Sequence, residues 1–187
     1  PDGPPEVLSA AALGAAQHAY LERLEQAIAS VPGGVTRILD VGSGTGANAR
    51  ALIERGYEVA CVSPSAQMNE MARAKLPDGT RVTDARFEAF ETDARFDICL
   101  FAESFHYIDL AAGLSQAARY AGKGVVIFDY FRRAGYEHTD GTRGSHVAFR
   151  EELARQGAFE IMSDEDLTAA ITPTFVIHEH LKNEKVA

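Results

Sequence analysis

The chain has 187 residues, 27 of them acidic and 18 basic, and a formal net charge of -9 at pH 7. This acidic balance argues against nucleic acid as the main partner, because phosphate binding needs a basic surface, and it favours a small-molecule substrate. Neither a run of about 20 apolar residues nor a basic, apolar leader stands out, so we expect no membrane partner.

The two cysteines, Cys61 and Cys99, both lie in apolar, strand-like segments. They predict buried free thiols in a reducing compartment, and therefore a cytoplasmic protein, rather than a disulfide. No Cys/His spacing indicates a metal site, so none is predicted.

Apolar periodicity predicts strands that alternate with helices after a leading helix over 6–29. The predicted strands are 38–41, 57–62, 80–83, 95–102, 125–130 and 157–162. The other predicted helices are 47–55, one opened by 63–65 and ending near 75, 111–120, 146–156 and one ending near 183. A turn is predicted at 121–124 and a loop at 131–145. Continuously apolar strands alternating with helices predict a doubly wound, mainly parallel α/β sheet with helices on both faces.

The most informative stretch is the turn after the first of these strands, where Gly42, Gly44 and Gly46 stand at alternate positions. Glycine accepts a positive φ in such a turn, and its missing Cβ lets the backbone approach a ligand. Exposed N–H groups at the start of the next helix would then hydrogen-bond that ligand. Asp40 adds a carboxylate at the strand end, where ligands of open α/β sheets bind.

Residues 39–46 resemble the first motif of class I S-adenosylmethionine-dependent methyltransferases. Residues 96–108 are similar to the family's fourth-strand motif, 119–129 to its turn and fifth strand, and 157–174 to the tail of many small-molecule members. The resemblance covers roughly residues 15–182. It implies a Rossmann-like methyltransferase fold, S-adenosylmethionine as the cofactor and a small molecule as the substrate.

One departure from the family pattern affects the expected ribose site. The family ends its second strand with an acid that binds the two ribose hydroxyls, and the alignment places Cys61 at that position. A thiol is a weak hydrogen-bond partner and does not replace a carboxylate, although Ser63 or Gln67 could compensate in part. We therefore expect cofactor binding to be weakened or lost.

Two further departures concern the adenine site and the sheet edge. An acid that binds the adenine amino group is replaced by Arg86, with Asp84 or Glu88 close enough to serve if the loop shifts. The chain stops soon after the last predicted helix, so either further residues follow or the sheet lacks the final strand of the family pattern and another chain covers its edge. Because an uncovered apolar edge invites pairing, we expect a homo- or hetero-oligomer.

The resemblance implies cofactor contacts from Asp40, Gly42, Ser43, Gly44, Gly46, Cys61, Val62, Gln67, Phe87, Glu88 and Ala102. After the fourth strand, His106 is the candidate base for a hydroxyl or protonated amine, and Glu103 would orient substrate or cofactor. An equal alternative is that His106 only packs or hydrogen-bonds within a common family motif. Substrate contacts are predicted for Tyr20, His106, Tyr107 and Tyr130.

We predict a single domain over 1–187, with an N-terminal helical cap (1–33), a cofactor-binding core (34–130) and substrate-side C-terminal elements (131–187). The first predicted function is methyl transfer to a small molecule in specialised metabolism. Two alternatives stay open. One is a methyltransferase-fold subunit that catalyses another displacement, such as an intramolecular alkylation that closes a ring. The other is a non-catalytic partner of a full-length enzyme.

Overall fold

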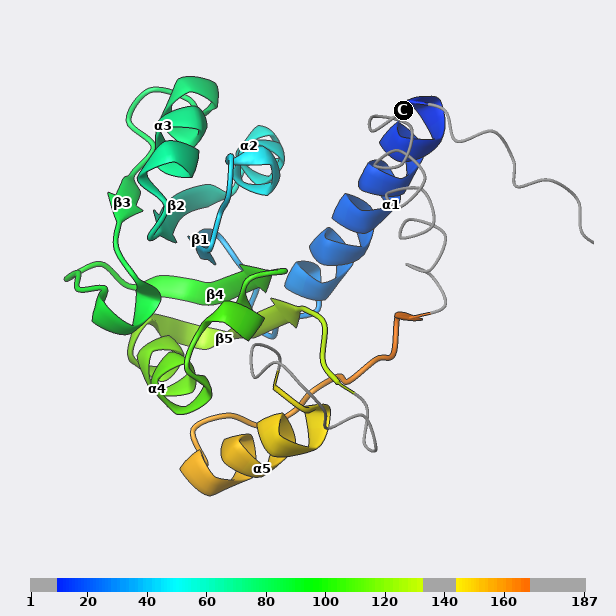
Figure 1. The fold of residues 1–187 in the computed structure, drawn as a ribbon, viewed down its shortest axis with the longest axis vertical. Coiled ribbons are helices and arrows are strands. Elements are labelled where there is room, and N and C mark those ends of the chain that lie inside the picture. Colours follow the sequence, from blue (N-terminus) through cyan, green and yellow to red (C-terminus); the bar gives the residue numbers. More distant parts are fainter. Residues whose placement is uncertain (1–9, 133–143, 169–187) are drawn as a thin grey trace, which may run out of the picture. The chain divides into compact units, whose positions relative to one another are not determined.

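The computed structural model describes residues 10–132 and 144–168 (Figure 1). The elements are α1 (Ala10–Ala29), β1 (Arg37–Val41), α2 (Ala47–Glu54), β2 (Glu58–Ser63), α3 (Ala66–Lys75), β3 (Val82–Asp84), β4 (Phe96–Ala102), α4 (Leu110–Tyr120), β5 (Ala121–Phe128) and α5 (His146–Gln156). Two short 3₁₀ helices, η1 (Phe87–Ala89) and η2 (Phe105–Tyr107), follow β3 and β4. The predicted last helix lies outside the described residues, as does most of the predicted loop.

The chain divides into two compact units. The larger unit comprises residues 25–160 and holds all five strands, and the smaller one comprises 1–24 and 161–187. In the smaller unit, Arg23 of α1 pairs with Glu165. The predicted single domain with an N-terminal cap stays a prediction. Among the described helices, none is both long and apolar enough to cross a membrane.

The strands of the larger unit form one parallel sheet in the order β3-β2-β1-β4-β5. Their carboxyl ends therefore meet at the same edge of the sheet. The chain runs outward from β1 to β3, then returns to β4 and β5 on the other side of β1, so the strand order reverses between β1 and β4. Ligands of doubly wound sheets bind outside the carboxyl ends at such a reversal.

Helices cover both faces of this sheet, with α2 and α3 on one side and α4 and α5 on the other (Figure 1). Because both faces are covered, the central strands β1 and β4 are buried along nearly their whole length, and apart from Arg37, Asp40 and Asp97 they are apolar without alternation. Polar caps fix where the helices begin: the Ser65 hydroxyl accepts a hydrogen bond from Met68 N at 3.4 Å, and the Asp109 carboxylate accepts one from Ala112 N at 2.9 Å. The predicted doubly wound α/β fold is confirmed.

A row of aromatic rings supports η1 and η2 at the carboxyl ends of the strands. Phe101 of β4 packs edge-on against Phe87 of η1 and Phe105 of η2, with ring centroids 5.4 and 5.0 Å apart. Phe105 in turn contacts Phe149 of α5, with centroids 5.6 Å apart. Edge-to-face pairs of this kind fix ring orientation as well as burying apolar area. The two short helices are therefore rigidly attached to the core.

Three sequence predictions need correction. Residues 157–162 do not form a strand, because Gly157 adopts a left-handed φ of 63° that ends α5 and Met162 is 75% exposed. Residues 121–124 are the first half of β5 rather than a turn, since the irregular pairing of Phe96 and Ile98 with β5 lets this glycine-rich segment stay in the sheet. The third strand begins two residues later than predicted, at Val82.

Candidate active-site cleft

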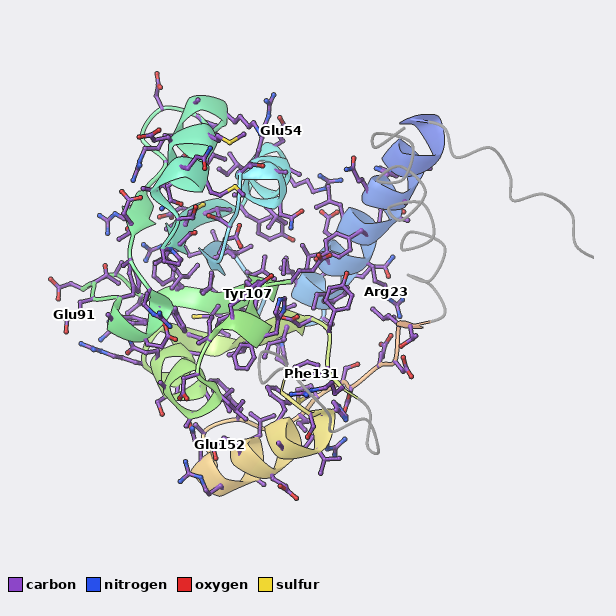
Figure 2. All side chains as sticks on the ribbon, viewed as in Figure 1. Arg23, Glu54, Glu91, Tyr107, Phe131 and Glu152 are labelled. Carbon is purple, nitrogen blue, oxygen red and sulfur yellow. The ribbon has the colours of Figure 1, made fainter. Side chains whose placement is uncertain are left out.

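A cleft of about 410 Å³ opens at the carboxyl ends of β1, β2 and β4. It is lined by the turn after β1, the end of β2, the segment around η1 and the segment after β4. The lining residues are Val41, Gly42, Gly44, Val62, Ser63, Pro64, Arg86, Phe87, Glu88, Glu103, Ser104, Tyr107 and Ile108. Tyr107 lies beside the arrowhead of β4, and its side chain is largely exposed (Figure 2).

The three glycines of the turn have different physical roles, although all have a positive φ. A Cβ at Gly42 would lie 2.4 Å from Ser104 Cβ, so this glycine allows the turn to pack on the segment after β4. A Cβ at Gly46 would lie 3.2 Å from Ala72 Cβ, so this glycine allows α2 to approach α3. A Cβ at Gly44 would meet no atom of a described residue within 4 Å. Of the three, Gly44 is the one that leaves open space at the cleft.

Asp40 is buried directly before this turn, with 1% of its surface exposed. Its Oδ2 has no hydrogen-bond partner among the described residues, and burial raises the pKa of its carboxyl to about 7. Cys61 lies opposite Asp40 in the β1–β2 register, and burial, followed by the charge of Asp40, raises the pKa of its thiol to about 12. A carboxylate without a partner in this position is costly unless a ligand supplies one.

The end of β2 places Ser63, not Cys61, at the cleft. Cys61 is 1% exposed and does not line the cleft, whereas Ser63 is the last strand residue and does. Asp84 pairs with Ser63 across the strands, but Asn69 and Arg73 of α3 hold its carboxylate at 2.6 Å each. The cleft end of β2 therefore carries the Ser63 hydroxyl and not the predicted Cys61 thiol, and the Asp84 carboxylate is bound to α3.

The segment around η1 presents charged groups to the cleft. The Glu88 carboxylate accepts a hydrogen bond from Asp109 N at 3.2 Å and lies 3.4 Å from an Arg86 nitrogen. Together with the backbone N–H groups that face it, this pairing holds the pKa of Glu88 below its usual value despite partial burial. Glu88 is therefore a fixed anion on the cleft wall at neutral pH.

The segment after β4 connects the two sides of the cleft. Glu103 has a φ of 61°, which is unusual for a residue with a side chain, and its N–H donates to Phe128 O at 2.7 Å. The next residue, Ser104, donates its hydroxyl to Val41 O at 2.5 Å. This sharp turn places Glu103 and Tyr107 at the cleft, and strained backbone of this kind is common at functional sites.

Just behind Tyr107, His106 of η2 is paired with Asp129, which follows β5. The His106 Nδ1 and Asp129 Oδ1 atoms are 2.5 Å apart, and the two side chains are 6% and 0% exposed. The His106 ring also lies against Tyr107, with ring centroids 3.9 Å apart. The predicted base is therefore one residue behind the cleft wall and is oriented by a buried carboxylate.

Comparison with known proteins identifies the core of the larger unit. A family model described as a methyltransferase domain matches residues 39–128, from β1 to the end of β5. This match supports the resemblance of residues 39–128 to class I S-adenosylmethionine-dependent methyltransferases. An uncharacterized methyltransferase of Mycobacterium tuberculosis (strain ATCC 25618 / H37Rv) is 34% identical over 89 residues, 48% of this chain and 37% of that protein. One from Alkaliphilus oremlandii is 32% identical over 72 residues, 38% of this chain and 33% of that protein. The match thus spans only about a third of the length of these curated relatives.

Solved methyltransferase structures share the fold of this domain. Geranyl diphosphate C-methyltransferase from Streptomyces coelicolor A3(2) has a TM-score of 0.63 at 17% identity, covering 74% of this chain and 59% of that one. N-methyltransferase NodS from Bradyrhizobium japonicum WM9 has a TM-score of 0.62 at 15% identity, covering 75% and 82%. The sugar N-methyltransferase KedS8 from Streptoalloteichus sp ATCC 53650 has a TM-score of 0.57 at 25% identity, covering 75% and 60%. The predicted Rossmann-like methyltransferase fold is confirmed.

The methyltransferase domain brings some of the predicted site residues together at its cleft. Those that line it are Gly42, Gly44, Val62, Phe87, Glu88, Glu103 and Tyr107. Those in the domain or just after it that do not line it are Asp40, Ser43, Gly46, Cys61, Gln67, Ala102, His106 and Tyr130. Tyr20 belongs to the smaller unit. The sequence analysis did not predict Ser104 or Ile108 as cleft residues, and it gave Ser63 only a compensating role. Ser63 could have been found from the sequence, because it is the polar residue that ends the apolar run of β2.

Proposed function

We propose that this chain is an S-adenosylmethionine-dependent methyltransferase that acts on a small molecule. The observation that carries the proposal is the open space at Gly44, where a ligand can lie against bare backbone. A cleft of about 410 Å³ is within the range of roughly 300–1,000 Å³ that holds small molecules. The relatives named as methyltransferases support the same reaction, and the sugar N-methyltransferase among the neighbours supports a small-molecule substrate.

The charges at the cleft suit a cationic cofactor. Among the described residues that line it, Glu88 and Glu103 stand against one cation, Arg86. Asp40 does not line the cleft, but its Oδ2, at the base of the turn, has no hydrogen-bond partner in the described part of the chain. Gly44, Val62, Phe87 and Glu88 would hold S-adenosylmethionine. When bound, the cofactor supplies a methyl group already activated on a sulfonium, so the protein has to align the substrate and exclude water.

His106 is the proposed base for a substrate whose attacking atom carries a proton. Its ring lies behind Tyr107, which lines the cleft, and it is ordered by Asp129. A neutral imidazole can accept a proton near neutral pH, which suits a hydroxyl or an amine that must lose one. Glu103, at the tight turn after β4, would orient the substrate or the cofactor in the cleft.

Calorimetry with S-adenosylhomocysteine tests the proposal without a known substrate. We expect one site per chain with a Kd in the micromolar range, which corresponds to about 8 kcal/mol of binding free energy. Absence of binding at millimolar ligand would overturn the proposed function. Native mass spectrometry of the purified chain would identify a ligand that stays bound.

The hydroxyl at the end of β2 gives a direct prediction about affinity. Ser63→Asp is expected to tighten S-adenosylhomocysteine binding by about 10- to 150-fold, because a carboxylate accepts strong hydrogen bonds from ribose hydroxyls. The matched control is Cys61→Asp, which would bury a second carboxylate opposite Asp40 and is expected to destabilise the fold without tightening binding. Calorimetry gives the affinities, and equal or weaker binding by Ser63→Asp would mean that the ribose lies elsewhere.

The lack of a carboxylate at the end of β2 also favours a second candidate function. With Ser63 at the cleft and Asp84 held by α3, the cofactor site has lost acids that the family pattern expects. This supports a methyltransferase-fold subunit that catalyses another displacement, such as an intramolecular alkylation, or a non-catalytic partner.

β5 is the outer strand of the described sheet, which supports a homo- or hetero-oligomer. Light scattering that finds only monomer at micromolar protein would contradict the oligomer.

A further inference from the structure

The carboxylate of Asp129 is the most fully hydrogen-bonded group near the cleft. Oδ2 accepts from Phe105 N at 2.6 Å and from His106 N at 3.2 Å. Oδ1 accepts from Tyr130 N at 2.7 Å and faces His106 Nδ1 at 2.5 Å. The side chain is fully buried, yet each oxygen has two partners, so burial leaves no acceptor unsatisfied.

These contacts determine which nitrogen of the His106 ring carries the proton. Three of the four partners are backbone N–H groups, which can only donate, so both carboxylate oxygens act as acceptors in these contacts. A group that only accepts requires a donor at the fourth position, which is Nδ1–H of the ring. The neutral imidazole is then left with Nε2 as its acceptor, and Nε2 has no hydrogen bond to any described residue.

The same carboxylate also fixes where that acceptor is. Through Phe105 N and His106 N it holds the backbone of η2, and through Nδ1 it holds the ring. Among residues 10–132 and 144–168, the other titratable side chains in contact with the ring are Tyr107, with centroids 3.9 Å apart, and Tyr130, with centroids 6.4 Å apart in an edge-on contact. Both contact the His106 ring through their own aromatic rings, so among these neighbours Asp129 is the charged group that orients it.

We propose that Asp129 is the positioning residue of the site: it holds His106 as the Nδ1–H tautomer, so that Nε2 accepts the proton of the substrate's attacking group. This inference rests on the proposed function. In the step, the bond between the attacking atom and its hydrogen breaks, the electron pair stays on that atom, and an Nε2–H bond forms. The resulting imidazolium is stabilised by the adjacent carboxylate, as in other carboxylate–imidazole pairs.

The tautomer can be observed directly by ¹⁵N NMR of the full chain, with the His106 signals assigned by comparison with His106→Gln. We expect the wild-type ring to be protonated at Nδ1 in its neutral form. In Asp129→Asn, an amide oxygen at the Oδ2 position can still accept from Phe105 N and His106 N. The amide NH₂ at the Oδ1 position then donates to Nδ1 and leaves Tyr130 N without this acceptor, so the ring proton is expected to move to Nε2. A merely structural role for Asp129 would not reverse the tautomer.

The matched control is Asp97→Asn, because Asp97 also accepts from two backbone N–H groups, those of Thr36 and Arg37, but lies away from the ring. It is expected to leave the His106 tautomer unchanged. A wild-type ring protonated at Nε2, or an Asp129→Asn ring still protonated at Nδ1, would overturn the inference. If Asp129→Asn does not fold, the wild-type spectrum alone tests the inference, by showing which ring nitrogen of His106 carries the proton. S-adenosylhomocysteine binding by the wild type is a separate readout, so its failure would refute the proposed function and leave the tautomer result standing.

Discussion

Replacing Gly44 with valine is expected to weaken S-adenosylhomocysteine binding by at least about 100-fold while the domain still folds. Within 4 Å of the Cβ position, the part of the chain that the structure describes leaves the cleft empty, so the new side chain would fill the volume that a ligand needs. The positive φ of 55° at this position adds a stability cost of about 1–3 kcal/mol. Calorimetry measures the binding, and urea unfolding measures the stability.

Two further variants separate blocked binding from a damaged fold. Gly44→Asn also fills the cleft, but asparagine tolerates a positive φ, so it is expected to weaken binding at a smaller stability cost. Gly42→Ala is expected to lose several kcal/mol of stability, because its Cβ would lie 2.4 Å from Ser104 Cβ in addition to the backbone strain. Undiminished affinity in both folded Gly44 variants would mean that the ligand binds elsewhere.

Asp40→Asn is expected to stabilise the ligand-free protein at pH 8 by up to about 4 kcal/mol and to leave its stability nearly unchanged below pH 4. Burial raises the pKa of Asp40 from 3.8 to about 7 in the folded state. Between these values the folded protein binds more protons at this group than the unfolded chain does. The contribution of Asp40 to the free energy of unfolding is therefore fully present below pH 4. It falls as the pH rises and levels off above pH 7. Asparagine does not ionise and removes this dependence.

Urea unfolding of both proteins at several pH values between 4 and 8 tests this prediction. The difference between the two curves isolates Asp40, because the other titrating groups are common to both. We expect the difference to grow by roughly a factor of ten in the unfolding equilibrium constant for each pH unit between 4 and 7. A difference that does not change with pH would mean that the carboxylate has found a partner in solution. If the buried oxygen serves the ligand, the stabilised variant should also bind S-adenosylhomocysteine less tightly.

The sequence alone determined the strand–helix alternation and the position of the glycine turn. Both depend on local patterns: continuous apolar runs in β1 and β4, and glycines where the backbone needs a positive φ. These patterns are visible because they follow from the chain's own neighbours in sequence. The sequence also placed His106 near the site, since η2 directly follows a central strand.

Only the tertiary structure decided what each site residue contacts. In the sequence, Gly42, Gly44 and Gly46 are equivalent glycines of one turn. In the structure, Ser104 packs where a Cβ of Gly42 would lie and α3 packs where a Cβ of Gly46 would lie, and both are distant along the chain. Ser63, rather than Cys61, reaches the cleft because the register with β1 buries Cys61 against Asp40. Asp129 meets His106 across 23 residues because β4 and β5 are parallel neighbours whose carboxyl ends coincide. Side-chain pairing between strands depends on register and helix packing, and no local pattern encodes either.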